Sequence, residues 1–183
     1  MPYRMPSQML PQSVDALKLC QQRARVAGSL SVSVLPRLSG QLQSGEGEVE
    51  AELVFGVDEQ SRKTVAGKIQ AVLSMQCQRC LERVEIPVTA TLSLALVWTD
   101  EQAAQLPRQL DPVLMESQQL DLHSIVEEEL LLALPLVATH SEGSCEPPGS
   151  GIANPALDET AVGRKENPFQ VLAALKSAGK RDD

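Results

Sequence analysis

Three runs of alternating apolar and polar residues between positions 48 and 98 constrain the fold of this chain more than any other feature. In each run the apolar side chains share one parity, as they do when a strand buries only one of its faces. The apolar sets span Val49 to Val57, Val65 to Met75 and Val84 to Trp98. Short polar turns at Asp58–Arg62 and Gln78–Leu81 separate the runs. The pattern predicts half-buried antiparallel strands joined as hairpins.

Helices are predicted on both sides of these strands. Residues 13–27 form a short helical pattern with Ser13 as N-cap and Gly28 after its end, followed by alternation at Leu30–Val34. A longer acidic helix is predicted from Asp121 to about Leu134, because Asp121 can cap its start and a proline follows. We therefore expect an α+β fold with an antiparallel sheet that could curl toward a barrel.

The chain divides by composition into three segments. Residues 1–140 are expected to form a single α+β domain that includes the cysteine hairpin. Residues 141–166 are rich in Gly, Pro, Ser and acids and are predicted to be a flexible linker. Residues 167–183 are predicted to be a C-terminal helix and tail that begins at Asn167-Pro168. Its apolar stripe, which contains Phe169 and Leu172, would pack on its own core or lie in a groove of a partner protein.

The sharpest chemical feature is a pair of cysteines, Cys77 and Cys80, in the turn between two strong strands. Thiolates three positions apart in a turn can bind one metal ion, and zinc would need two further ligands. His140 and Cys145 follow the acidic helix and could supply them, with Cys20 and His123 as the other candidates. A redox-active pair usually lies near a βαβ unit, which is missing here. Reduced, structurally incidental thiols remain an alternative.

A run of three glutamates lies on the acidic helix at positions 127–129. With Leu122, Val126 and Leu132 counted as inward, a helical turn of about 100° per residue places Glu129 near the centre of the apolar arc. Glu127 and Glu128 would then point away. A carboxylate on an apolar face must find a partner or shift its pKa, so Glu129 is interpreted as a structural, partner-paired group or a catalytic acid.

The charge of the chain is unevenly distributed. The formal net charge is -8, yet residues 1–45 carry five basic side chains and one acidic one. An acidic body repels phosphate backbones and favours basic partners, so DNA binding is not expected. Only the N-terminal stretch has the sign for RNA contact, and its candidates are Lys18, Arg23, Arg25 and Arg37. Both charge sets could also be solvated faces. Aromatic residues are 2% of the chain, too few for a base-stacking platform.

Two further signals concern location. The longest apolar run, Leu130–Ala138, contains a proline and is far shorter than a membrane-spanning helix requires. The N-terminus lacks a basic stretch followed by an apolar one, so no signal peptide is predicted. We expect a cytoplasmic protein that does not contact membranes.

Three segments in this order resemble the YceD family, the large ribosomal RNA subunit accumulation proteins. They are MQCQRCL at 75–81, the acidic helix that ends in Leu-Pro and continues to Cys145, and NPFQVLAALK at 167–176. Matched by position, Cys77 and Cys80 correspond to the family's CxxC, Glu129 to its helix carboxylate and Cys145 to its distal cysteine, and Asn167, Pro168 and Phe169 correspond to its tail motif. Some relatives carry additional distal cysteines, whereas this segment reads HSEGSC.

The resemblance implies a role in the synthesis, processing or stability of 23S ribosomal RNA, without a known catalytic activity. The implied partner is a 23S precursor or a large-subunit assembly intermediate, and the acidic body suggests contact through a basic protein. We therefore expect a non-enzymatic factor. The alternatives are a zinc-stabilised interaction module and a ribonuclease. A ribonuclease would need an acidic or His/Lys constellation at a phosphate, and the sequence offers only the lone Glu129.

Overall fold

A computed structural model describes residues 8–141 and 143–145 of the chain, which belong to one compact unit. The predicted helix and tail at 167–183 and nearly all of the predicted linker at 141–166 lie outside the described residues. The described part combines helices with two sheets, which confirms the α+β class. None of its helices is long and apolar enough to cross a membrane.

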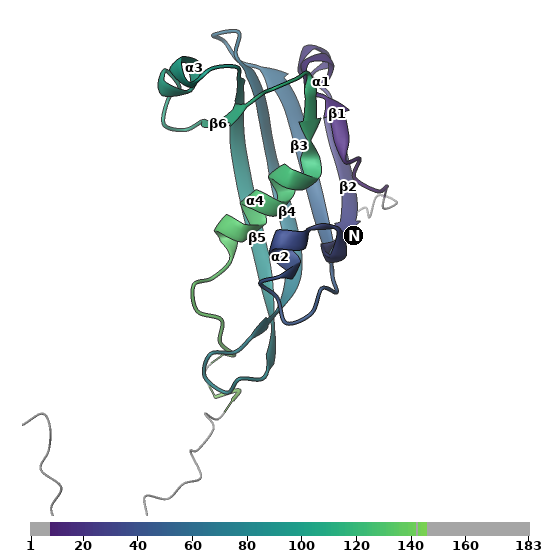
Figure 1. Cartoon of the computed structure of the whole chain (residues 1–183), viewed down its shortest axis with the longest axis vertical. Coiled ribbons are helices and arrows are strands. Elements are labelled where there is room, and N and C mark those ends of the chain that lie inside the picture. Colours follow the sequence, from purple (N-terminus) through teal and green to yellow (C-terminus); the bar gives the residue numbers. More distant parts are fainter. Residues whose placement is uncertain (1–7, 142, 146–183) are drawn as a thin grey trace, which may run out of the picture. The chain divides into compact units, whose positions relative to one another are not determined.

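A five-stranded sheet forms the frame of the molecule (Figure 1). Its spatial order is β2-β3-β4-β5-β6, and its strands are β2 (Arg25–Ser31), β3 (Glu48–Val57), β4 (Lys63–Gln76), β5 (Arg83–Val97) and β6 (Asp111–Leu114). The neighbours from β2 to β5 pair antiparallel, which was predicted for β3, β4 and β5, whereas β6 pairs parallel with the end of β5. The alternation at Leu30–Val34 predicted a strand there, but β2 ends at Ser31 and Val32–Val34 form a short 3-10 helix. The two outer strands of this order, β2 and β6, do not pair with each other, so the described sheet is open and the barrel expectation is not met.

The predicted alternation determines which face of the sheet is buried. Odd positions of β3 and β4 and even positions of β5 are buried, including Leu53, Ile69 and Leu92. The residues between them, such as Glu50 and Gln70, are exposed on the other face. Burial of one parity in three adjacent strands fixes their register, because a slip by one residue would expose the whole apolar set.

Helices and a small ribbon cover the buried face (Figure 1). Helix α1 (Ala16–Gln22) packs on β3, and α4 (Leu122–Ala133) packs on β5. The ribbon pairs β1 (Ser13–Asp15) with β7 (Gln119–Asp121), so it joins the starts of these two helices. The other helical segments are η1 (Val32–Val34), α2 (Pro36–Ser39) and α3 (Asp100–Ala104).

The N-terminal helix is shorter than predicted, and the prediction of 13–27 was wrong at both ends. Asp15, not Ser13, caps it by accepting from the Lys18 N–H at 2.9 Å. Arg23 ends it with a φ of 49°, in the left-handed region. Gly28 lies inside β2, where a Cβ would come within 2.5 Å of the Gln8 carbonyl oxygen. This glycine therefore permits close backbone packing and does not terminate a helix.

Candidate metal centre

The turn between β4 and β5 positions the two cysteines of the CxxC motif. The Cys77 N–H donates to the Glu82 carbonyl at 2.8 Å, and the Leu81 N–H donates to the Cys77 carbonyl at 2.8 Å. Leu81 has a φ of 66°, which reverses the chain in a left-handed conformation. Cys77 is buried and Cys80 is half-buried at this hairpin end.

The segment after α4 passes over the same turn. The Gln78 N–H donates to the carbonyl of Ala138 at 2.8 Å, and the Gln78 side-chain amide donates to the carbonyl of Leu136 at 3.3 Å. Ala138 is buried against Cys77 and Val84, in a small apolar cluster separate from the main core. These contacts bring the segment that carries His140 and Cys145 to the hairpin.

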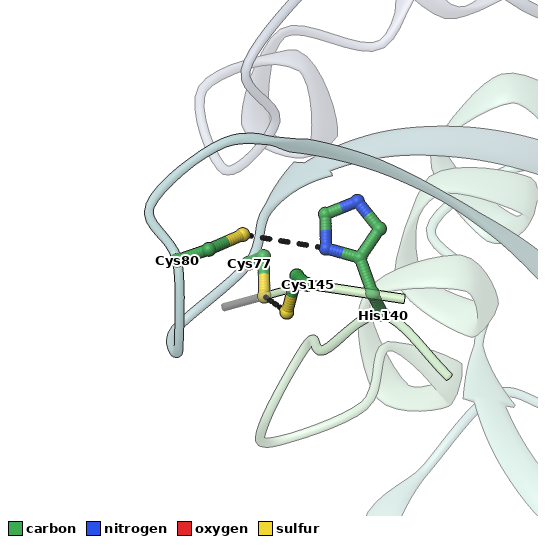
Figure 2. A group of neighbouring side chains, drawn as sticks. All are labelled: Cys77, Cys80, His140 and Cys145. Carbon is green, nitrogen blue, oxygen red and sulfur yellow. Dashed lines mark hydrogen bonds between the residues drawn. The ribbon is translucent and has the colours of Figure 1, made fainter. Parts of the chain in front are cut away.

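Four potential ligand atoms converge at this junction (Figure 2). One from each of Cys77, Cys80, His140 and Cys145 lies within 4.8 Å of all the others. The Cys77 and Cys145 sulfurs are 3.9 Å apart, and the Cys80 sulfur is 3.4 Å from His140 Nδ1. Two sulfurs bound to one tetrahedral zinc at about 2.3 Å would be about 3.8 Å apart. These two pairs therefore have the spacing of ligands on a tetrahedral zinc, and all four atoms are close enough to bind one metal ion.

The hydrogen bonding of His140 presents the correct nitrogen to this cluster. Its Nε2 lies 3.0 Å from the Arg83 carbonyl oxygen. A carbonyl can only accept, so Nε2 carries the proton and Nδ1 retains a free lone pair. A zinc-bound histidine commonly donates its other ring N–H to a carbonyl or carboxylate, which fixes both the tautomer and the orientation of the ring.

The electrostatics around Cys77 favour a thiolate. Backbone N–H groups, first that of Cys80 and then that of Arg79, lower the pKa of Cys77 to about 5. For Cys80 the backbone N–H of Glu82 favours the thiolate, but burial and the nearby Cys77 and Cys145 sulfurs raise its pKa overall. Metal ligation requires thiolates, and Cys77 is ready to ligate at neutral pH.

Arg79, one of the two residues between Cys77 and Cys80, would balance the charge of a metal-bound cluster. Its Nε donates to the Cys145 sulfur at 3.0 Å, and this bond raises the pKa of the guanidinium. Three thiolates and one Zn²⁺ sum to one negative charge, which the guanidinium would neutralise. No role was predicted for Arg79 from the sequence, although its place inside the CxxC motif was the available signal.

The residues present therefore fit a zinc ion. With four protein ligands, no coordination position would be left open, and such closed sites are structural. A bound zinc would join the β4–β5 hairpin to the segment after α4 and supply folding free energy to both. The other two ligand candidates lie elsewhere: Cys20 is buried in α1, and His123 Nε2 lies 3.0 Å from the Leu10 carbonyl oxygen.

The buried carboxylate of the acidic helix is Glu127, not Glu129. Glu127 is 6% exposed, and its Oε1 accepts from the backbone N–H of Arg37 at 2.7 Å and of Leu38 at 3.1 Å. The prediction that Glu127 points away from the core was wrong. Glu129 is half-buried, and burial raises its pKa, with further contributions from Asp111 and Glu128.

The four candidate RNA-contacting residues are all exposed but do not lie together. Lys18 and Arg23 lie on and directly after α1, near the start of β2. Arg37 lies on α2, beyond the other end of β2 (Figure 1). Arg25 forms a surface ion pair with Glu52, so part of its charge is already compensated. The partner-binding candidates Asn167, Pro168, Phe169 and Leu172 lie outside the described residues.

Comparisons with known proteins cover most of the chain. Residues 65–176 match the family model described as large ribosomal RNA subunit accumulation protein YceD. A Haemophilus influenzae protein of the same description is 34% identical over 168 residues, which is 91% of this chain and 96% of that protein. No solved structure matches the chain. The matched range includes Cys77, Cys80 and Cys145 and the Asn167–Phe169 motif.

Proposed function

This chain belongs to the YceD family, and we propose from that membership that it is a non-enzymatic factor in large ribosomal subunit biogenesis. Its target would be 23S ribosomal RNA, whose synthesis, processing or stability it would support. The single observation that carries the proposal is the similarity to a relative named for large ribosomal RNA subunit accumulation, which extends over 91% of the chain. The site of action would be the cytoplasm.

Two features of the described residues support a role without catalysis. The four-ligand cysteine and histidine cluster, once it held zinc, would have no open position for a substrate or an activated water. The buried carboxylate Glu127 is already engaged by two backbone N–H groups. A ribonuclease is the rival proposal, and incubation of the purified protein with precursor RNA and Mg²⁺ tests it. Clean cleavage would favour the enzyme.

The charge distribution supports contact through a basic protein. Beyond residue 45 acidic side chains outnumber basic ones by 23 to 11, so this part of the chain repels a phosphate backbone. Direct RNA contact would use Lys18, Arg23, Arg25 and Arg37. The partner would be a 23S precursor or an assembly intermediate, reached mainly through its protein component.

A zinc-stabilised protein–protein interaction module is a second candidate, favoured by the ligand cluster. It is compatible with the first, because the metal would hold the surface on which a partner docks. The two differ in whether ribosomal RNA accumulation is the main or a secondary effect.

The test of the proposed function is the ratio of 23S to 16S rRNA in cells that lack this protein, with precursor ends mapped. We expect a selective fall in 23S rRNA, because only the large subunit depends on the factor. Altered ends would indicate a processing fault, and normal ends an assembly or decay fault. Restoring the gene provides the control, and an unchanged ratio would contradict the proposal.

A further inference from the structure

The outer, solvent-facing side of the sheet carries a hollow of about 560 Å³ that the candidate metal centre does not use. It spans the loop before β3 and the adjoining ends of β3, β4 and β5. Val72, which is 54% exposed, and Pro87 lie opposite each other in the register of β4 and β5 and form an apolar part of its lining.

The lining of this hollow is strongly acidic. Four glutamates contribute to it, against a single basic side chain, Arg83. Arg83 pairs with Glu85 at 3.2 Å, whereas the other three lining glutamates have no ion-pair partner among the described residues. These three are Glu46, Glu48 and Glu50. Gly47 between them has a φ of 135°, which lets the loop turn here and places acids on both sides of the turn.

A buried hydroxyl provides a second, independent sign of a ligand. Ser74 shares the outward parity of Gln70 and Val72 on β4 and lines the hollow. It is only 3% exposed, yet its Oγ has no hydrogen-bond partner in the part of the chain that the structure describes. Leaving a buried hydroxyl without a partner is costly, so such a group is expected to find one from outside the chain.

We propose that this hollow binds an arginine- or lysine-rich segment of a basic protein. The aliphatic stem of a basic side chain would lie on Val72 and Pro87. Its cationic head would lie among the glutamates and donate a hydrogen bond to Ser74 Oγ. An RNA strand is disfavoured because carboxylates repel phosphates. The inference rests on the proposed function in one respect: the basic protein is taken to be part of a large-subunit assembly intermediate.

The hollow also adjoins the candidate metal centre. Arg83 lines the hollow with its side chain, while its carbonyl oxygen accepts from His140 Nε2. A zinc ion bound by His140 would thereby fix the hairpin end that forms one wall of the docking surface. The metal would stabilise the surface without contacting the partner.

The test measures binding of a fluorescein-labelled peptide that alternates arginine with glycine, by fluorescence anisotropy with the full chain. We expect salt-sensitive binding, and no binding of the matched peptide with glutamate in place of arginine. The double variant Glu48→Gln/Glu50→Gln should bind the arginine peptide roughly tenfold more weakly, because it removes two unpaired carboxylates. The control Glu59→Gln/Glu116→Gln removes the same charge at exposed positions outside the hollow and should change binding less than about twofold.

A second variant tests the buried hydroxyl. Ser74→Ala should weaken binding of the arginine peptide roughly fivefold while leaving the melting temperature unchanged or higher, because it removes an unpartnered polar group. The inference is overturned if the wild-type chain does not bind the peptide. It is also overturned if the two double variants bind equally well, or if Ser74→Ala leaves binding unchanged.

Measurements in cells separate this inference from the proposed function. If cells that lack the protein contain less 23S rRNA but the purified protein does not bind the peptide, the docking site is rejected and the proposed function stands. If the peptide binds through Glu48 and Glu50 but the 23S to 16S ratio is unchanged in those cells, the docking site is supported and the proposed function is rejected.

Discussion

At the scale of single residues, Glu127 explains how a four-residue helix is held in place. Helix α2 begins after Leu35, whose side chain cannot cap it, and its first residue Pro36 has no N–H. The next two backbone donors, from Arg37 and Leu38, both bind Glu127 Oε1. A carboxylate from α4 thus caps α2 and ties together two helices on the same face of the sheet.

We predict that Glu127→Ala lowers the free energy of unfolding by about 2 kcal/mol, because two partly buried N–H groups lose their acceptor. Glu127→Gln should lose much less, since its amide oxygen can still accept both bonds. Urea denaturation of the two variants measures the difference. Equal losses would show that the negative charge, and not the capping geometry, is what matters.

In contrast to Glu127, which stabilises the fold, ionised Glu129 should destabilise the folded protein. Its pKa in the folded protein is raised above 4.5 by burial, Asp111 and Glu128. Its stabilising contribution is therefore fully present below about pH 4.5 and is lost as the pH rises through the folded-state pKa. Glu129→Gln should raise the melting temperature by up to about 3 °C at neutral pH, with no gain below the ordinary pKa of glutamate.

Thermal melts at both pH values check this prediction, with Glu59→Gln as an exposed control. A gain that persists at the lower pH would mean that the amide improves packing, and that the charge is not the cause.

At the scale of elements, the β4–β5 hairpin and the segment after α4 depend on each other. The apolar cluster at this junction consists of Cys77, Val84 and Ala138 with a few half-buried neighbours, so little apolar surface is buried there. Backbone hydrogen bonds hold this junction together, and a bound zinc ion would add to its stability.

We predict about one zinc ion per purified chain, lost on Cys77→Ser, because three remaining ligands do not close a tetrahedral site. The matched control is Cys20→Ala, which removes a cysteine outside the cluster and should retain the metal. Elemental analysis gives the stoichiometry. Amide hydrogen exchange at Gln78 and Leu81 should accelerate when the metal is chelated, because the β4–β5 turn and the segment after α4 then separate and expose these N–H groups. A metal-free protein with slow exchange at both amides would reject the zinc site.

The central strands could be predicted from sequence because period two and one-sided burial coincide in β3, β4 and β5. The first helix could not, because the residues from Arg25 onward leave the helical pattern to pair with β3 as β2, and this pairing is not local in sequence. The phase of α4 was wrong for a local reason. Leu132 was counted as inward but is 78% exposed, whereas Leu130 is fully buried. In a run of consecutive leucines, periodicity cannot determine how the helix is rotated about its axis. The error placed Glu129, instead of Glu127, on the buried face.

The candidate site was predicted more completely than the helices. A turn between two strong strands determines how Cys77 and Cys80 are presented, and both features are local in sequence. The convergence of His140 and Cys145 depends on Pro135 ending α4 and on Gln78 binding Ala138. Only the first of these was visible in the sequence. The outer hollow could not be predicted, because its lining comes from three strands and a loop and depends on the register between them.

At the scale of the whole molecule, the acids and the candidate RNA contacts occupy different places. The acidic hollow lies on the outer face of the sheet, over β3, β4 and β5. Lys18 lies on α1 and Arg23 directly after it. Arg25 lies at the start of β2, where it pairs with Glu52, and Arg37 lies beyond the other end of β2. This arrangement offers no continuous basic groove for a nucleic acid among the described residues, and it supports the proposal that a protein component of the partner is contacted.

We predict that the isolated protein binds 23S precursor fragments weakly at about 0.15 M salt. The dependence of log K on log salt should be shallow, with a slope no steeper than about -4, because at most four basic side chains meet phosphates. Reversing Lys18, Arg23, Arg25 and Arg37 to Glu should abolish this residual binding. The arginine–glycine peptide should still bind, because none of the four residues lines the hollow. Filter binding across a salt series measures the slope, and anisotropy with the same variant provides the control. Tight RNA binding that survives the four reversals would show that another surface, not these side chains, contacts the RNA. The acidic body would then have to be reinterpreted as a solvated face.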